Sequence, residues 1–292
     1  MSDTTIPIPR LDRDEISAVV QVDFGGASEI GRKRSQNQDH YMIAELKRQL
    51  SVLSTDVPLE SCDALYGSEP GHLLVVADGM GGHCNGEIAS STAVQVCARY
   101  VLDMMYWFLK LSAQNEEDFT DELSRSLSSA QKALWSQLES GSNPMGTTVT
   151  LAYIVWPRMY VIHAGDSRCY VSRDGELKQI TTDHTVAQKM VDEKIMTQEE
   201  AATSPFSHVL WNCVGGGDHA VRPEVVRYRL RPSDQVLLCS DGLHGMISDE
   251  AIATVLNSSP DAAASVKRLL VEANDAGGRD NITAIVGRFE RV

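Results

Sequence analysis

The sequence lacks paired cysteines, a secretory signal and an apolar segment long enough to cross a membrane. Its 6 cysteines stand singly, without the CxxC spacing of zinc or redox motifs, so reduced intracellular thiols are expected. Residues 1–15 carry acids and prolines where a secretory signal needs a basic start and an apolar run. The most apolar segment, 100–111, contains Asp103 and Lys110 and is shorter than the roughly 20 residues of a membrane span. We therefore expect a cytoplasmic protein that makes no contact with membranes.

Basic residues are also too few to balance the acidic ones. The chain has 26 Lys and Arg against 40 Asp and Glu, a formal net charge of −14, which repels phosphate backbones and anionic membranes. No nucleic-acid partner is therefore expected. Hydrophobic residues make up 42% of the 292 residues, which is enough for packed domains and excludes disorder along the whole chain. The acidic excess suggests instead that some carboxylates are gathered around a cation.

The order of strand and helix patterns predicts an α+β fold with antiparallel sheets. Helical segments are interleaved with strands without regular βαβ alternation, and turn residues predict an antiparallel meander over 147–181. We expect a flexible tail at 1–17 and one domain at 18–292, with an exposed insertion at 45–71. Strands are predicted at 18–25, 40–44, 72–77, 147–155, 158–164, 167–172, 176–181, 221–229, 235–239 and 283–289, and helices at 87–111, 119–138, 186–193, 198–202, 249–256 and 262–276.

Four aspartates stand at the end of an apolar run or beside a glycine turn. They are Asp78 in VVADGMGGH, Asp166 in VIHAGDSRCY, Asp241 in VLLCSDGLHG and Asp280 in AGGRDNITAIV. One such aspartate is usually a turn residue, because its side chain accepts local backbone hydrogen bonds. Four of them can meet at one edge of antiparallel sheets, where their mutual repulsion calls for a cation. Mg²⁺ and Mn²⁺ prefer oxygen ligands, so the pattern predicts a divalent metal site.

The glycine that follows Asp78 fits the same prediction. At Gly79 the absence of a side chain lets the backbone carbonyl approach a metal ion directly. The alternative is a nucleotide-binding loop. It fails because Cys84 stands at the third glycine position of GxGxxG and no GK[ST] follows.

A basic segment upstream, GRKRSQNQD at 31–39, adds cations and a fifth carboxylate, Asp39. An arginine beside a metal centre can dock a phosphoryl group through two parallel hydrogen bonds. For Arg32 and Lys33 we expect a solvated surface loop instead.

Seven motifs, spread over about 20–290, resemble those of the metal-dependent type 2C Ser/Thr protein phosphatases, the PPM family, and of its prokaryotic branch in particular. Each motif alone is weak, but all seven occur in the family's order. They are GxxRxxNQD at 31–39, DGMGGH at 78–83, MGTT at 145–148, GDSR at 165–168, TDH at 182–184, SDG at 240–242 and DNIT at 280–283.

The resemblance implies a four-layer α-β-β-α sandwich, in which two central antiparallel sheets are flanked by helices. It also implies two Mn²⁺ or Mg²⁺ ions, with a weaker third, in a cleft at one edge of the sheets. Asp78 would bridge the two ions, and the carbonyl of Gly79 would bind one of them. Asp241 and Asp280 would complete the other site.

Three further roles follow from the same resemblance. Asp39 would support the second ion directly or through water. Asp166 would share the third ion with Asp241, and Arg34 would bind the phosphate of the substrate.

The resemblance further implies a monomeric phosphatase for proteins that Ser/Thr kinases have phosphorylated on serine or threonine. A metal-activated water would attack the phosphorus without a covalent intermediate, because two metal ions can lower the pKa of water and align it. Two alternatives stay open. One is a catalytically silent binding or regulatory module, and the other is a phosphoesterase for small molecules with the same metal chemistry.

The chain departs from the family's pattern at several positions. Gln38 stands where many relatives have glutamate, which puts the affinity for one metal ion in question, and Met80 replaces the histidine proposed as general acid in animal relatives. We expect a local structural role for His83. The predicted flap, 191–217, lacks the usual arginine, so a different substrate preference is expected. His184, which precedes the flap, is expected either to contact substrate or to form a structural hydrogen bond.

Overall fold

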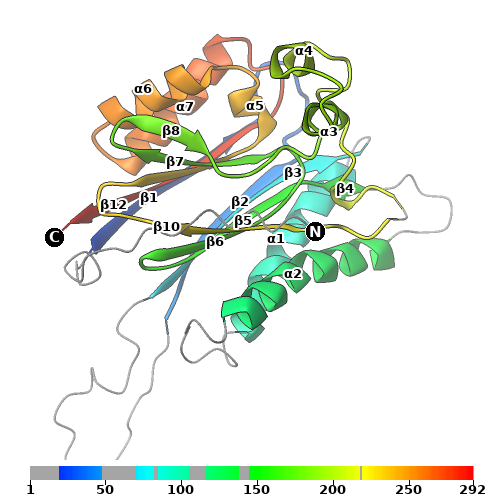
Figure 1. Cartoon of the computed structure of the whole chain (residues 1–292), viewed down its shortest axis with the longest axis horizontal. Coiled ribbons are helices and arrows are strands. Elements are labelled where there is room, and N and C mark those ends of the chain that lie inside the picture. The colour runs from blue at the N-terminus through cyan, green and yellow to red at the C-terminus, as the bar shows by residue number, and fades with distance from the viewer. Residues whose placement is uncertain are drawn as a thin grey trace, which may run out of the picture.

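The computed structural model is a sandwich of two antiparallel sheets with helices on both outer faces (Figure 1). This arrangement confirms the predicted α+β class and the four-layer α-β-β-α order. The residues that the structure describes are 20–47, 70–81, 85–104, 116–137, 145–217 and 219–291.

The first sheet has five strands in the order β1-β12-β11-β7-β8. The first and last strands of the chain, β1 and β12, lie side by side in this sheet. They pair along the whole length of β1, from Val20 opposite Arg291 to Glu29 opposite Ile282. The strands are β1 (Val20–Glu29), β7 (Arg168–Arg173), β8 (Glu176–Gln179), β11 (Gln235–Cys239) and β12 (Ile282–Arg291).

The second sheet has seven strands in the order β10-β6-β5-β3-β4-β9, and β2 pairs with β3 off this path. The apolar run predicted as a buried strand is β3, which lies inside this sheet. Its side chains from Leu73 to Ala77 are at most 1% exposed. The strands are β2 (Asp39–Leu46), β3 (Gly71–Met80), β4 (Gly146–Thr147), β5 (Val149–Val155), β6 (Arg158–Ala164), β9 (Val214–Gly215) and β10 (Glu224–Arg229).

Apolar side chains form three layers that hold the sheets and helices together. Alternate residues of β3 separate into two of them: Leu73 and Val75 face the helices, whereas Leu74 and Val76 pack between the sheets. In Figure 1, α1 and α2 cover the seven-stranded sheet, and α6 and α7 cover the five-stranded one. The helices are α1 (Asn85–Met104), α2 (Glu116–Gln137), α3 (Val186–Asp192), α4 (Gln198–Ala202), α5 (Asp241–His244), α6 (Asp249–Ser258) and α7 (Ala262–Asp275).

The predicted meander over 147–181 is wrong in one respect. β6 pairs with β5 and β10 in the seven-stranded sheet, whereas β7 pairs with β8 and β11 in the other sheet. The chain changes sheet just after β6, at Gly165, whose φ of +123° favours glycine. A Cβ there would lie 2.5 Å from the Thr148 side chain. Turn residues mark where strands end, but they do not specify which sheet the next strand joins.

Several predicted element bounds agree with the structure, and others cannot be compared. The bounds of β6, α4 and β11 match the prediction, whereas the short β9 and α5 were not predicted. Residues 1–17 of the predicted tail and 48–69 of the predicted insertion lie outside the described residues, as do 105–111 of the first predicted helix. Within the described part of the chain, no helix is both long and apolar enough to cross a bilayer.

Candidate metal centre

One cavity of about 840 Å³ gathers four of the five predicted carboxylates. Asp78 lies near the end of β3 and Asp166 where the chain changes sheet. Asp241 begins α5, and Asp280 comes just before β12. Strand ends from both sheets thus meet at one edge, as the sequence predicted. Other predicted residues that line this cavity are Arg34, Gln38, Gly79 and Met80.

The fifth carboxylate, Asp39, lies opposite Asp78 in the pairing of β2 with β3. Its Oδ2 accepts hydrogen bonds from the hydroxyls of Ser240 and Thr283, each at 2.7 Å. Its Oδ1 has no hydrogen-bond partner among the described residues. Burial raises the pKa of Asp39 to about 7, although the two hydroxyls lower it. Ser240 and Thr283 belong to the SDG and DNIT motifs, but their function as anchors was not predicted.

The carboxylates that line the cavity are held close to groups of like charge. Burial, followed by the charges of Asp39 and Asp241, raises the pKa of Asp78 well above its ordinary value. Burial also raises the pKa of Asp166 and of Asp241, with a neighbouring aspartate as the next cause for each. Oδ1 of Asp241 has no partner in the described part of the chain. Such a cluster must take up protons or a cation, and its oxygen donors fit Mg²⁺ or Mn²⁺.

Arg34 and Asp280 are paired with each other, although the sequence predicted different ligands for them. The Arg34 Nε donates to Oδ1 of Asp280 at 2.7 Å, and Nη2 donates to Oδ2 at 2.5 Å. This hydrogen-bonded pair is the main cause that raises the pKa of Arg34. The Arg34 side chain is 55% exposed, so a fixed positive charge lies at the mouth of the cavity in the bidentate geometry that also suits phosphate.

Close packing explains the glycine at position 79. A Cβ on Gly79 would lie 2.0 Å from the carbonyl oxygen of Gly86 and 2.7 Å from that of Gln38. The Gly79 N–H donates to that same Gln38 carbonyl at 3.1 Å. The glycine therefore brings the backbone after Asp78 against the start of α1. His83, in the same motif, lies outside the described residues.

The flap places a histidine near the carboxylates that the sequence reading did not single out. His208 offers a ring nitrogen within 4.8 Å of carboxylate oxygens of Asp166 and Asp241. Its Nδ1 lies 3.9 Å from Oδ2 of Asp241, and its side chain is 78% exposed. The only signal in the sequence was the unusual composition of the flap.

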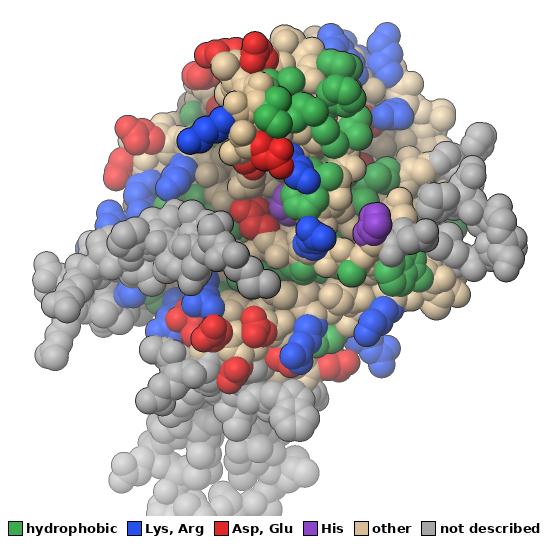
Figure 2. Space-filling model, turned by 45° about the vertical axis from the view of Figure 1, so that its right-hand side comes forward, with side chains coloured by type: hydrophobic (Ala, Val, Ile, Leu, Met, Phe, Trp, Pro, Cys, Tyr) green, Lys and Arg blue, Asp and Glu red, His purple; other side chains and the backbone are tan. Residues whose placement is uncertain are grey.

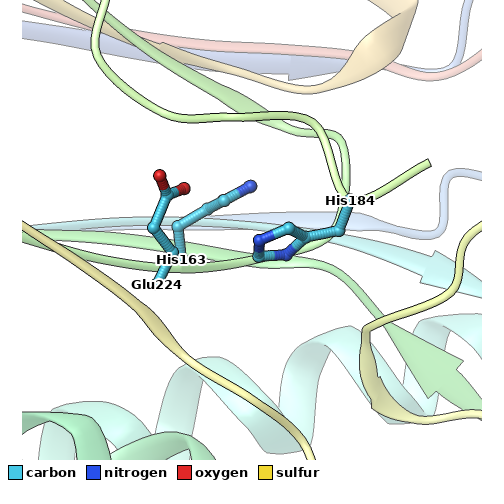
Figure 3. Close-up of side chains that lie close together, drawn as sticks. All are labelled: His163, His184 and Glu224. Carbon is cyan, nitrogen blue, oxygen red and sulfur yellow. The ribbon is translucent and has the colours of Figure 1, made fainter. Parts of the chain in front are cut away.

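Figure 3 shows a second group of potential ligands, which consists of His163, His184 and Glu224. None of the three is among the residues that line the cavity. The Thr150 hydroxyl donates to the Ser167 carbonyl at 3.0 Å and therefore accepts from Nδ1 of His163 at 2.9 Å. Nε2 of His163 is left with a lone pair and has no partner among the described residues. Burial lowers the pKa of His163 to about 3, so its ring is neutral at pH 7.

His184 shows that this second group is structural. Its Nδ1 accepts the Gly165 N–H at 3.2 Å and lies 2.9 Å from the amide nitrogen of Asn212, so both contacts require a lone pair on Nδ1. Burial lowers the pKa of His184 to about 4, and the neutral ring then carries its proton on Nε2, where a metal would need a lone pair. His184 therefore links the turn beside Asp166 to the flap, which agrees with the predicted structural hydrogen bond.

Comparison with known proteins identifies the family to which this fold and cavity belong. A family profile described as Protein phosphatase 2C matches residues 61–286. The chain therefore belongs to the protein phosphatase 2C family, as the order of its motifs predicted.

Bacterial relatives are similar in both sequence and structure. Serine/threonine protein phosphatase PstP of Mycobacterium tuberculosis is 37% identical over 77% of this chain, but the match covers only 41% of PstP, so the chain spans less than half of that relative. Serine/threonine phosphatase stp of Listeria monocytogenes is 30% identical over 73% of this chain and 83% of its own length.

Two solved structures of PstP also resemble this chain. The crystal structure of the M. tuberculosis phosphatase PstP/Ppp has a TM-score of 0.74 and 32% identity, and covers 94% of this chain and 100% of the solved chain. The catalytic domain of PstP in complex with two manganese ions has a TM-score of 0.71 and 31% identity, and covers 93% and 100%, respectively.

Proposed function

We propose that this chain hydrolyses phosphoserine and phosphothreonine in phosphorylated proteins with two Mn²⁺ or Mg²⁺ ions. The observation that carries the proposal is the convergence of Asp78, Asp166, Asp241 and Asp280 on one cavity, with Arg34 at its mouth. The two manganese ions in the related PstP structure support the same metal chemistry. Bound ions of this kind neutralise the phosphate and activate water for in-line attack.

The residues of the cavity divide into metal ligands and a phosphate ligand. Asp78 would hold both ions, with Asp241 and Asp280 at one and the carbonyl of Gly79 at the other. Asp39 would support the second ion from behind the cavity, where Ser240 and Thr283 fix one of its oxygens. Asp166 and Asp241 would hold a weaker third ion.

Arg34 would exchange one anion for another during substrate binding. If Asp280 held a cation, the guanidinium of Arg34 that it now binds would be free for another anion. The same two N–H groups can then donate to two oxygens of the phosphate, because carboxylate and phosphate accept a guanidinium in similar bidentate geometry. This exchange reconciles the observed ion pair with the two predicted roles.

Several finer expectations belong to the same proposal. The enzyme would work as a monomer in the cytoplasm and oppose Ser/Thr kinases, with one catalytic domain at 18–292 and a flap at 191–217. The cysteines that the structure describes, Cys97, Cys169, Cys213 and Cys239, are free.

Hydrolysis of a phosphothreonine peptide tests the proposed function. With Mn²⁺, phosphate release is expected from the wild-type chain, and a chelator should abolish it. Asp78→Asn should lower kcat/KM about a thousandfold or more, because it removes several kcal/mol of metal-dependent stabilisation. Asp121→Asn is the matched control, because Asp121 is exposed on α2, and it should leave kcat/KM unchanged.

The same assay separates the alternatives. A rate that neither the chelator nor Asp78→Asn lowers would contradict the metal mechanism. Faster hydrolysis of small phosphate esters than of phosphopeptides would favour the small-molecule phosphoesterase. No hydrolysis of either substrate would favour the silent module.

A further inference from the structure

Exposed apolar side chains are concentrated on the segment between α4 and β9. Phe206 and Val209 are each 45% exposed, and Trp211 is 40% exposed. Ile195, after α3, is 68% exposed. Figure 2 shows hydrophobic side chains gathered on the upper part of a face of the molecule, the height at which α3 and α4 lie in Figure 1. Contiguous exposed apolar surface of this kind marks an interaction site more often than scattered single residues do.

Hydrogen bonds fix the backbone that presents these side chains. The Val186 N–H donates to the Val209 carbonyl at 2.7 Å, and the Trp211 N–H donates to the His184 carbonyl at 3.0 Å. His184 in turn donates its own N–H to the Gly165 carbonyl at 2.7 Å. The segment is therefore tied, through His184, to the turn that carries Asp166. Little backbone freedom is left to lose when a ligand binds to this surface.

The same segment forms one wall of the catalytic cavity. His208 and Leu210 line the cavity together with Asp78 and Asp241, and Val209 between them is 45% exposed without lining it. The segment reaches this wall from a turn, in which the Val209 N–H donates to the Phe206 carbonyl at 3.2 Å, and Leu210 then forms a bridge with Thr185. A polypeptide that passes over this wall with its phosphate at the carboxylates would bring the residues next to the phosphorylated one to the exposed side chains of Phe206 and Val209.

Two of the exposed side chains are best placed to contact such a polypeptide. The ring of Trp211 is already packed, with the His184 ring centroid at 5.0 Å and Nζ of Lys189 at 5.6 Å. Phe206 and Val209 lie on either side of Ser207 and His208 and present nearly half of their surface to solvent. We call these two side chains the flap rim.

We propose that the flap rim binds an apolar side chain next to the phosphorylated residue, and thereby selects phosphoproteins whose phosphoserine or phosphothreonine is flanked by residues such as leucine. This inference rests on the proposed phosphatase function. The occupant is a segment of a substrate because the rim continues the wall of the cavity in which the phosphate would bind.

Two phosphothreonine peptides that differ only in their flanking residues, leucine in one and serine in the other, test the proposal. The full chain with Mn²⁺ should show a kcat/KM about tenfold higher for the leucine peptide, because one apolar side chain leaves water on binding. The double variant Phe206→Ser/Val209→Ser should bring this ratio close to one. Each single variant should remove part of the preference.

Val271→Ser is the matched control, because Val271 lies on α7 and is 48% exposed. It should keep the wild-type ratio. Thermal melting of every variant checks that the comparison is made between folded proteins.

Three results would overturn the inference in distinguishable ways. Equal rates for the two peptides in the wild type, or a preference that survives in the double variant, would show that the flap rim does not select substrates. Neither result would contradict the phosphatase function. An elution volume that depends on concentration in the wild type but not in the double variant would assign the rim to self-association. Failure to hydrolyse either peptide would contradict the proposed function itself.

Discussion

The layer between the two sheets and the cavity at their edge are built by the same strands in opposite ways. β3 contributes Leu74 and Val76 to the layer and then Asp78 to the cavity. β11 contributes Leu238 to the layer, and Asp241 of the cavity follows two residues after the strand ends. Each strand thus adds apolar burial along its length and places a carboxylate near its end.

The two regions have opposite effects on the free energy of folding. Full burial of one leucine stabilises a protein by about 1.5–3 kcal/mol, whereas a carboxylate loses hydration when it is buried among like charges. The raised pKa values of Asp39, Asp78, Asp166 and Asp241 express that loss. The packed layer therefore stabilises the fold, and the buried carboxylates destabilise it until a cation binds.

The largest effect on stability is expected from the layer. Leu238 is 0% exposed. Leu238→Ala should lower the free energy of unfolding by about 2–5 kcal/mol, because the smaller side chain leaves a cavity. Activity per folded molecule should be retained. Urea denaturation with a phosphopeptide assay measures both, and Val225→Ala, at a position 39% exposed, is the control with little effect. Lost activity at unchanged stability would contradict the division between the two regions.

The next effect should come from Asp39, the buried carboxylate paired with Asp78 beside the cavity, and have the opposite sign. The pKa of Asp39 rises from 3.8 to about 7 on folding, so folded protein binds its proton more tightly. The tighter proton binding contributes to the free energy of unfolding. This contribution is fully present below the pKa of the unfolded state and is lost as pH rises through about 7. In the metal-free protein, the wild type should therefore lose stability between pH 5 and 7.5, and Asp39→Asn should not undergo this loss. Over this range the free energy of unfolding of the variant should rise relative to that of the wild type by on the order of 1 kcal/mol or more.

Thermal melting in a chelator at a series of pH values measures this difference. Asp121→Asn, at an exposed position, should follow the wild-type curve. An Asp39→Asn curve that falls with pH as steeply as the wild type would show that Asp39 is not held with a raised pKa.

The smallest effect is expected at the mouth of the cavity. Arg34→Lys keeps the positive charge but loses the bidentate geometry, so KM for a phosphopeptide should rise about tenfold with a smaller change in kcat. Its effect on stability should be slight, since the Arg34 side chain is 55% exposed. Arg32→Lys, which affects an exposed pair with Asp275, is the control. If Arg34→Lys and Arg32→Lys changed KM equally, Arg34 would have no specific part in phosphate binding.

Local patterns in the sequence predicted the elements better than their long-range partners. Turn residues on both sides specified β6 and β11, and aspartates at the end of an apolar run or beside a glycine turn specified the four carboxylates of the cavity. The change of sheet at Gly165 was not predicted, because it depends on the approach of Thr148 from a different strand.

Local patterns also did not predict the contacts in and beside the cavity. The pair between Arg34 and Asp280 and the anchoring of Asp39 by Thr283 each join residues from opposite ends of the chain. The motifs contained all four residues but not which of them meet. Only the folded arrangement of both sheets specifies those contacts.

Calorimetric titration of Mn²⁺ into the metal-free chain tests most directly whether the destabilising carboxylates form a cation site. At pH 6.5, two ions should bind to the wild type, and the heat should change with the ionisation enthalpy of the buffer, because raised carboxylate pKa values make metal binding release protons. Asp78→Asn should bind fewer ions and release fewer protons. Absence of Mn²⁺ binding to the wild type, or a heat independent of the buffer, would contradict this account.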